Sequence, residues 1–281
     1  MGGRNSRKQF PDKLAAVSHR RHASLNSKVE IFCLGNLSVR TNPTSLLAPL
    51  KRNSQPTALL QLLIAAGPHG VDKTEAEIKL WTRAQTELAD NTLDTTLYRL
   101  RKLLGNHMTI EVANGIVRLD ETHVRVDAWI FAEVAEELCV RMQASSISVE
   151  SKEIADHCDY LFDLYKGHFL AKDRTTPWIA QMRDTLQSKF FRAIKLAGTR
   201  WQAMQEWDQA VQLYERALEL DNFAEEIHRE LMRCHLARGE FADVVRVFRR
   251  CRDLFSLVLG VGPSDATEKV YRQALARTSS T

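Results

Sequence analysis

The side chains best placed for binding chemistry lie on one face of a helix predicted over residues 91–104. Leucines in this segment recur at spacings of four, three and four, which puts them on one stripe of an α-helix. The opposite face carries short polar groups at its start and long basic groups at its end, namely Asn91, Thr92, Thr95, Tyr98, Arg99 and Lys102. Such a face suits the major groove of duplex DNA, because small hydrogen-bonding groups reach base edges while basic groups meet phosphates.

The same pattern is also typical of an ordinary amphipathic surface helix, so the segments around it have to decide between the two interpretations. Residues 29–39 are rich in β-forming residues and predict a short hairpin. Ser54 is the expected cap of a buried helix that ends at Gly67. Asp72 followed by Glu75 forms a capping-box pattern that begins a second helix. Two helices therefore precede the predicted binding helix.

A second hairpin is predicted directly after the binding helix. Gly105 is a natural C-cap for that helix. Two alternating runs over residues 108–119 flank Asn114-Gly115, which is the strongest short-range signal for a β-hairpin. Three short helices followed by a hairpin is the order of a winged helix-turn-helix. This order favours the DNA-binding interpretation.

The second half of the chain has helical patterns throughout. Asp127 is the expected cap of a helix over residues 128–142, and Thr176-Pro177 begins another that runs to about Trp201. Four pairs of residues then lie 34 positions apart: Glu206 and Glu240, Trp207 and Phe241, Tyr214 and Phe248, Ala217 and Cys251. A period of 34 with aromatic and small residues in these places is typical of tetratricopeptide repeats. So few repeats need the upstream helices to complete a stable stack.

The charge of the chain is unevenly distributed. Residues 1–28 contain seven Lys or Arg and one acid, so they carry +6, while the remainder carries −2. The basic segment reads either as an arm that lies along phosphates or as a disordered start that contributes little. With a nearly neutral body, DNA binding has to depend on a local basic patch.

Other classes of function find little support in the sequence. The five cysteines form no CxxC motif, which argues against a zinc site and a disulfide framework. We found no glycine-rich phosphate loop, HExxH or GxSxG motif, and Asp156-His157-Cys158 cannot converge because consecutive helical residues diverge. We therefore expect no catalytic residue, metal or cofactor. No apolar run reaches the ~20 residues of a membrane span, and no secretory signal is predicted, so we expect a cytoplasmic protein.

Several segments together resemble a known family. They are residues 80–81, 95–105, 124–131 and 165–170, then Trp178 and Arg183, then residues 217–255 and 259–267. Their order and spacing resemble the bacterial transcriptional activator domain regulators of the Streptomyces antibiotic regulatory protein type. The resemblance implies a mainly α protein, in which an N-terminal winged helix-turn-helix with small β-hairpins precedes an all-α tetratricopeptide-like domain. The corresponding boundaries are a tail over residues 1–28, a winged helix over 29–122 and the helical domain over 123–281.

The resemblance also implies a function. It predicts an activator, without an enzymatic activity, that binds repeats in double-stranded promoter DNA as a homodimer, contacts RNA polymerase and associates with the bacterial nucleoid. It adds Arg118, in the predicted wing, to the DNA-binding residues. The alternative is a protein-interaction scaffold whose winged helix no longer reads DNA, because Glu87, Asp90 and Asp94 would repel phosphate near the start of the binding helix.

Overall fold

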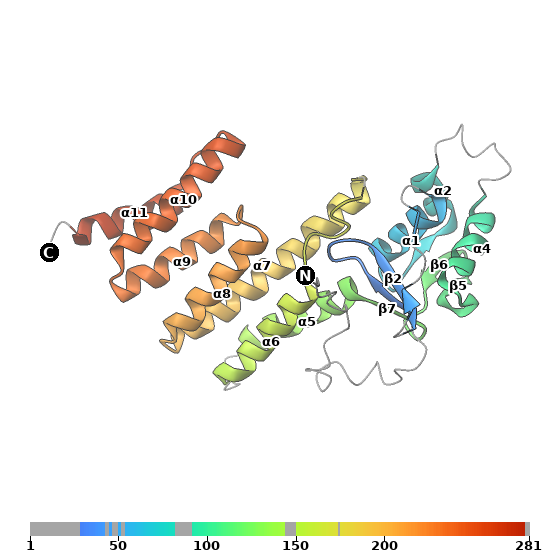
Figure 1. The fold of residues 1–281 in the computed structure, drawn as a ribbon, viewed down its shortest axis with the longest axis horizontal. Coiled ribbons are helices and arrows are strands. Elements are labelled where there is room, and N and C mark those ends of the chain that lie inside the picture. Colours follow the sequence, from blue (N-terminus) through green and yellow to red (C-terminus); the bar gives the residue numbers. More distant parts are fainter. Residues whose placement is uncertain are drawn as a thin grey trace, which may run out of the picture. The chain divides into compact units, whose positions relative to one another are not determined.

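The computed structural model describes residues 29–42, 45–46, 50–51, 54–81, 92–143, 150–173 and 175–278 (Figure 1). The predicted basic tail, the polar loop before the binding helix, Asn91 and the break at Ser145-Ser146 lie outside these residues. The chain forms two compact units. Unit 1 consists of Met1–Glu133 and Phe162–Leu186, and unit 2 of Val134–Leu161 and Gln187–Thr281. The predicted domain boundaries stay a prediction.

A small mixed sheet begins unit 1. Its strands are β1 (Val29–Phe32), β2 (Ser38–Asn42), β3 (Ser45–Leu46) and β7 (Val124–Val126), in the order β3-β2-β1-β7. The antiparallel pairing of β1 with β2 confirms the first predicted hairpin. The parallel pairing of β1 with β7, which brings Val29 opposite Val124, was not predicted. A three-residue strand is too short to show an alternating pattern, and its partner lies far away in sequence.

The helices of unit 1 follow the predicted order, and a second sheet closes the arrangement. The elements are α1 (Gln55–Ala66), β4 (Val71–Asp72), α2 (Lys73–Leu80), α4 (Leu93–Leu104), the 3-10 turn η3 (His107–Thr109), β5 (Ile110–Ala113) and β6 (Ile116–Leu119). The β5–β6 hairpin turns at Asn114 and Gly115, whose φ angles of 51° and 80° are those of a type I′ turn. Strand β4, too short to be predicted, adds to the outer side of β6.

Local hydrogen bonds explain why these helices begin and end where they do. The Ser54 hydroxyl accepts from the Thr57 amide, and the Asp72 carboxylate accepts from the amides of Thr74 and Glu75. At the other end of α4, Gly105 adopts φ 67°, a left-handed conformation that glycine reaches without strain. The predicted caps Ser54, Asp72 and Gly105 are therefore confirmed, whereas Asp127 is the first residue of its helix and its carboxylate bonds elsewhere.

Three long helices, α5 (Asp127–Gln143), α6 (Ser151–Leu164) and α7 (Pro177–Ala203), contribute residues to both units. Unit 2 continues with α8 (Trp207–Leu220), α9 (Glu225–Arg238), α10 (Phe241–Leu259) and α11 (Asp265–Thr278). The 34-residue period is realised as two helical hairpins, because Trp207 and Phe241 are the first residues of α8 and α10. The predicted fold class, mainly α with small N-terminal hairpins, is confirmed. None of the helices in the described ranges is both long and apolar enough to span a membrane.

Close packing of α7 on α8 depends on a glycine. A Cβ atom built on Gly198 would overlap the Tyr214 hydroxyl and the ring carbon Cζ that carries it. Tyr214 is fully buried and cannot swing into solvent. We expect Gly198→Ala to lower the free energy of unfolding by about 1–3 kcal/mol through overpacking. Chemical denaturation checks this, with Gly262→Ala as control, because no atom lies within 4 Å of a Cβ at that position. Equal stability of the two variants would contradict the packing argument.

A buried histidine should make unit 2 sensitive to acid. Burial lowers the pKa of His228, and the positive charge of Arg250 lowers this pKa further. A hydrogen bond from its Nε2 to the Asn222 carbonyl (2.9 Å) acts in the opposite direction, but the net pKa is lowered. The unfolded chain therefore binds a proton more readily than the folded chain. Stability from neutral His228 is complete above the unfolded pKa of about 6.5 and is lost as pH falls below it. Thermal unfolding of wild type and His228→Asn between pH 7.5 and 5 should show a steeper loss in the wild type; parallel curves would refute this.

Candidate nucleic-acid interface

Helix α4 places its two faces as the leucine spacing predicts. Leu93, Leu97, Leu100 and Leu104 are all at most 2% exposed and form part of the core of unit 1. On the opposite side, Thr92, Tyr98, Arg99 and Lys102 are exposed and Thr95 is half-buried. Tyr98 leaves 61% of its surface open, so its ring and hydroxyl can both reach a ligand. The structure thus brings these five predicted residues together on one outward surface.

The helical period orders the side chains across this surface. Thr95, Tyr98 and Lys102 follow one another at spacings of three and four, so they form its central line. Arg99 lies on one flank of that line and Asp94 on the other. At the N-terminal end the hydroxyls of Thr92 and Thr95 share a hydrogen bond of 2.8 Å, while Thr92 also caps the helix. The face therefore runs from paired hydroxyls through a phenol to two cations.

The acidic residue on the flank has a basic neighbour. Asp94 Oδ1 lies 3.5 Å from Lys73 Nζ at the start of α2, and both side chains reach solvent. This ion pair reduces the repulsion that Asp94 would exert on a phosphate, although a surface pair is weak and screened by salt. Glu87 and Asp90, the other two acids expected to repel phosphate, lie outside the described residues.

The wing carries its predicted cation in an ion pair. Arg118 on β6 faces Glu111 on β5, and its Nε and Nη2 lie 2.9 and 2.7 Å from the same carboxylate oxygen. Both side chains are about half exposed. Arg118 can therefore meet a phosphate only by sharing or leaving Glu111. Sequence reasoning missed this pair, although the pairing that follows from a turn at Asn114-Gly115 places residues 111 and 118 opposite each other.

Another basic residue of α4, which was not among the predicted DNA-binding residues, has a structural role. Arg101 Nη2 donates to the Ile110 carbonyl at 3.0 Å, which ties the helix to the first strand of the wing. Its position on the helix is next to the leucine stripe, away from the central line of the exposed face. Arg101 therefore positions the wing relative to α4.

Two polar clusters, the first of them buried, hold the scaffold of unit 1. The Asp127 carboxylate accepts hydrogen bonds from the amides of Cys33 (2.9 Å) and Leu34 (3.1 Å) and from the Cys33 thiol (2.9 Å). Burial raises the pKa of Asp127, while these hydrogen bonds oppose the increase. Burial, the nearby Asp127 charge and the hydrogen bond to it also raise the pKa of the Cys33 thiol, which keeps it protonated. Asp127 was predicted only as a helix cap, and its link to the first hairpin is new.

Arg183 organises the second cluster. Its Nε donates to the Phe169 carbonyl at 2.7 Å, its Nη1 to the Thr175 hydroxyl at 2.7 Å, and its Nη2 to the Leu170 carbonyl. Leu170 has a positive φ of 50°, which is strained for a leucine. Nη2 also donates to the Asp173 carbonyl at 3.4 Å, so the guanidinium holds this strained turn, which precedes α7, through four acceptors.

Comparison with known proteins places the chain in a family. Residues 126–275, more than half of the sequence, match the model of the bacterial transcriptional activator domain. The chain belongs to the bacterial transcriptional activator domain family. This confirms the resemblance noted in the sequence and makes the protein a transcriptional regulator by family. Asp127 and Arg183 both lie within the matched region.

The fold outside the matched region is also known. The chain is similar to the structure of Mycobacterium tuberculosis EmbR in complex with a low-affinity phosphopeptide, with a TM-score of 0.66 and 15% sequence identity. The alignment covers 90% of this chain and 66% of the EmbR chain, so the protein spans just under two thirds of EmbR. At this identity the likeness concerns the fold alone. No curated protein matches the sequence.

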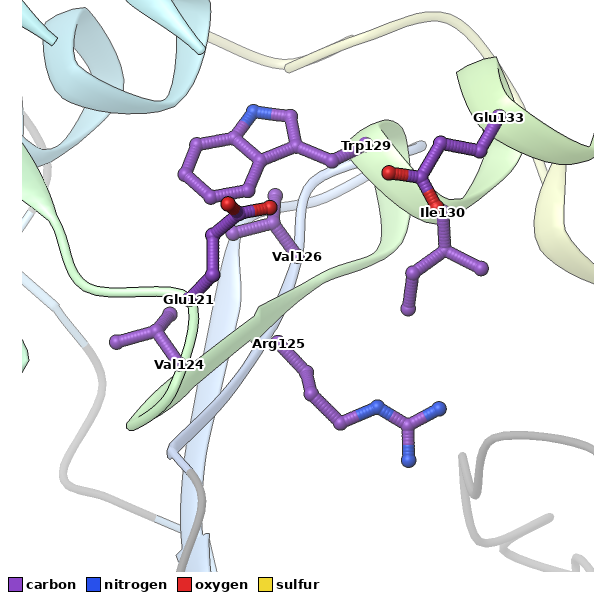
Figure 2. Close-up of a pocket in the computed structure, with 7 residues that line it drawn as sticks. All are labelled: Glu121, Val124, Arg125, Val126, Trp129, Ile130 and Glu133. Atoms are coloured by element: carbon purple, nitrogen blue, oxygen red, sulfur yellow. The ribbon is translucent and has the colours of Figure 1, made fainter. Parts of the chain in front are cut away.

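At the start of the region that matches the activator domain family lies a pocket too small for a ligand (Figure 2). It is lined mainly by β7 and the first turns of α5, including Val124, Val126, Trp129 and Ile130, and has room for about one water molecule. Figure 2 shows Arg125 pointing away from Trp129. The Trp129 indole donates to the Ile64 carbonyl at 2.8 Å and so joins α5 to the end of α1. The pocket is a packing gap beside this contact.

Titratable groups elsewhere in the described chain do not assemble into a reactive site. In Asp156-His157-Cys158, Asp156 is exposed while His157 and Cys158 are buried, and burial raises the pKa of Cys158 to about 12. His235, Glu240 and Asp243 come within 4.8 Å of one another, as metal ligands can. However, Glu240 already pairs with Arg238 at 2.8 Å and Asp243 with Arg246 at 2.6 Å. The cluster of His235, Glu240 and Asp243 is therefore an ion-pair network at the turn between α9 and α10.

Proposed function

We propose that this regulator binds double-stranded promoter DNA through the exposed face of α4. Thr92, Thr95 and Tyr98 would meet base edges in the major groove, and Arg99 and Lys102 would meet phosphate or a guanine edge. Asn91 and Arg118 complete the proposed contact surface. The observation that supports this most is the division of α4 into a fully buried leucine stripe and an outward polar and basic face. Burial of the leucines fixes the helix, so that this face is available to a groove.

Binding as a homodimer to promoter repeats, contact with RNA polymerase and activation of transcription are further parts of the proposal, supported by the family resemblance. The winged helix would occupy residues 29–122 and the helical repeat domain residues 123–281. A location on the nucleoid of a bacterial cytoplasm follows from the same function. The upstream region of the chain's own gene is the first duplex in which to seek a binding site.

A gel-shift series on that upstream region tests the proposal. The duplex should be shifted at low salt in the presence of excess competitor DNA, and affinity should fall as salt rises because condensed counterions are released on binding. A selection from random duplexes extends the test to sites elsewhere in the genome. If the protein binds all duplex sequences with equal affinity at low salt, or binds none, sequence-specific binding is refuted.

Two observations favour a second function, a protein-interaction scaffold that does not read DNA. Arg118 in the predicted wing already forms an ion pair with Glu111. Residues 29–281 also carry no excess of positive charge. Helical repeats commonly present extended surfaces to proteins. Binding to protein partners together with an unshifted duplex in the experiment above would favour this function over the first.

A further inference from the structure

The last long helix of the repeat region runs past the length that the repeat requires. Helix α8 has 14 residues and α10 has 19, and with the 34-residue period the end of α8 at Leu220 corresponds to Leu254. Residues 255–259 at the end of α10, with Gly260 and Val261 directly after it, therefore form an overhang (the end of α10 is seen in Figure 1). Its first residue, Phe255, still packs beside Phe223, with ring centroids 6.4 Å apart.

The rest of the overhang exposes apolar side chains. Leu257 is 86% exposed, and Val258, Leu259 and Val261 are between 53% and 59% exposed. Single exposed leucines are common on protein surfaces, but four large apolar residues within five positions are not. Such a run promotes aggregation unless it has a partner. The overhang is therefore a candidate binding surface.

Positive charge exceeds negative charge on the same side of α10, because Asp253, the acid on this face, already pairs with Arg252 at 2.8 Å. Arg250 and Leu257 are seven residues apart, hence on one helical face, and Arg249 lies beside them. Both arginines are exposed, and within the described ranges neither forms an ion pair, whereas Arg246 pairs with Asp243 at 2.6 Å. Arg250 is close enough to His228 for its charge to affect that group. The face thus presents two available guanidinium groups followed, two turns later, by an exposed leucine.

We propose that this α10 docking face, made of Arg249, Arg250, Leu257, Val258 and Val261, binds an amphipathic helix of a partner protein whose apolar stripe is flanked by Glu or Asp. Leucine-type residues of the partner would cover the overhang, and its carboxylates would accept paired hydrogen bonds from the guanidinium groups. The proposal does not depend on DNA binding by α4.

Charge selects this occupant over two others. A second copy docked through the same face would set the arginines of one copy against those of the other in a parallel arrangement, or against the apolar run of the other in an antiparallel one. In neither case do Arg249 and Arg250 gain an unpaired carboxylate, and a buried cation without a partner is costly. The chain's own N-terminal segment is also unsuitable, since residues 1–28 contain seven Lys or Arg and one acid. An acidic partner neutralises Arg249 and Arg250 and covers the apolar run in a single event.

A display library of amphipathic helical peptides tests the proposal with the full chain as bait. Leucines are fixed at helical spacing, and the flanking positions are randomised among Glu, Lys, Gln and Ser. Selected peptides should be enriched in Glu, and the best should bind at least tenfold more weakly to Arg249→Glu/Arg250→Glu and to Leu257→Ser. A peptide with Lys in place of Glu should prefer the charge-reversed variant. Circular dichroism verifies that the variants keep their helical content.

The matched control is Lys152→Glu/Lys172→Glu, which reverses two exposed charges elsewhere and should leave peptide binding unchanged. Enrichment without an acidic bias, or peptides that bind the Arg249→Glu/Arg250→Glu variant as well as the wild type, would overturn the proposal. So would self-association of the wild-type chain that Leu257→Ser abolishes, since this would identify a second copy as the occupant. Analytical ultracentrifugation at rising protein concentration measures that outcome directly.

Discussion

Replacing Asp127 with alanine should lower the free energy of unfolding of unit 1 by about 3–5 kcal/mol. The carboxylate accepts hydrogen bonds from two backbone amides and one thiol, all buried, and its removal leaves these donors without an acceptor. Each buried donor that loses its partner costs about 1–3 kcal/mol. Removing one member of a buried charged pair costs about 3–5 kcal/mol, which is the range expected here. Asp127→Asn should cost less free energy than Asp127→Ala, because the amide oxygen can still accept a hydrogen bond. It should still destabilise the unit, because the amide NH2 group then faces another donor.

Hydrogen exchange distinguishes this local effect from a general loss of stability. In Asp127→Ala the amides of Cys33 and Leu34 should exchange much faster, together with β1 and the start of α5, which the carboxylate links. Asp156→Ala is the control, because that aspartate is exposed on α6 and should leave exchange at these amides unchanged. Unaltered protection of Cys33 and Leu34 in the alanine variant would show that the cluster contributes little.

The contrast between Asp127 and α4 shows which features the sequence can predict. Helix α4 has a stripe of four leucines and a terminal glycine, local signals that agree, and the structure has both in their predicted roles. Asp127 was equally visible as the start of a helix, and α5 begins at it. Its bonds to Cys33 and Leu34 were not, because they join residues more than 90 positions apart and depend on how β1 and β7 pair.

Side-chain partners show the same limit. The pairing of Arg118 with Glu111 could have been inferred, since a turn at Asn114-Gly115 fixes the register of the two strands. The approach of Lys73 to Asp94 and the four acceptors of Arg183 could not, because they depend on the packing of separate elements. Likewise, the exposed run at the end of α10 resembles a buried helix end in sequence. Only the 86% exposure of Leu257 in the structure shows that none of the described residues covers it.

The double variant Arg99→Ala/Lys102→Ala should weaken promoter binding by about 10–100-fold, with the fold of unit 1 unchanged. Both side chains are exposed on the face of α4 opposite the buried leucines, so their removal creates no cavity. Removing one cation that contacts a phosphate should reduce the slope of log affinity against log salt concentration by about 1. If both cations contact phosphate, the double variant should therefore reduce this slope by about 2. Affinity measured by fluorescence anisotropy over a salt series gives both quantities.

The single variants then separate reading from positioning. If Arg99 donates to a guanine edge, Arg99→Ala should reduce discrimination between the selected site and its mismatched version by about 1–3 kcal/mol, whereas Lys102→Ala should weaken both duplexes equally. Lys152→Ala/Lys172→Ala removes the same total charge from other exposed positions and controls for the general field of the protein. Wild-type affinity and slope in Arg99→Ala/Lys102→Ala would remove α4 as the DNA-contacting element.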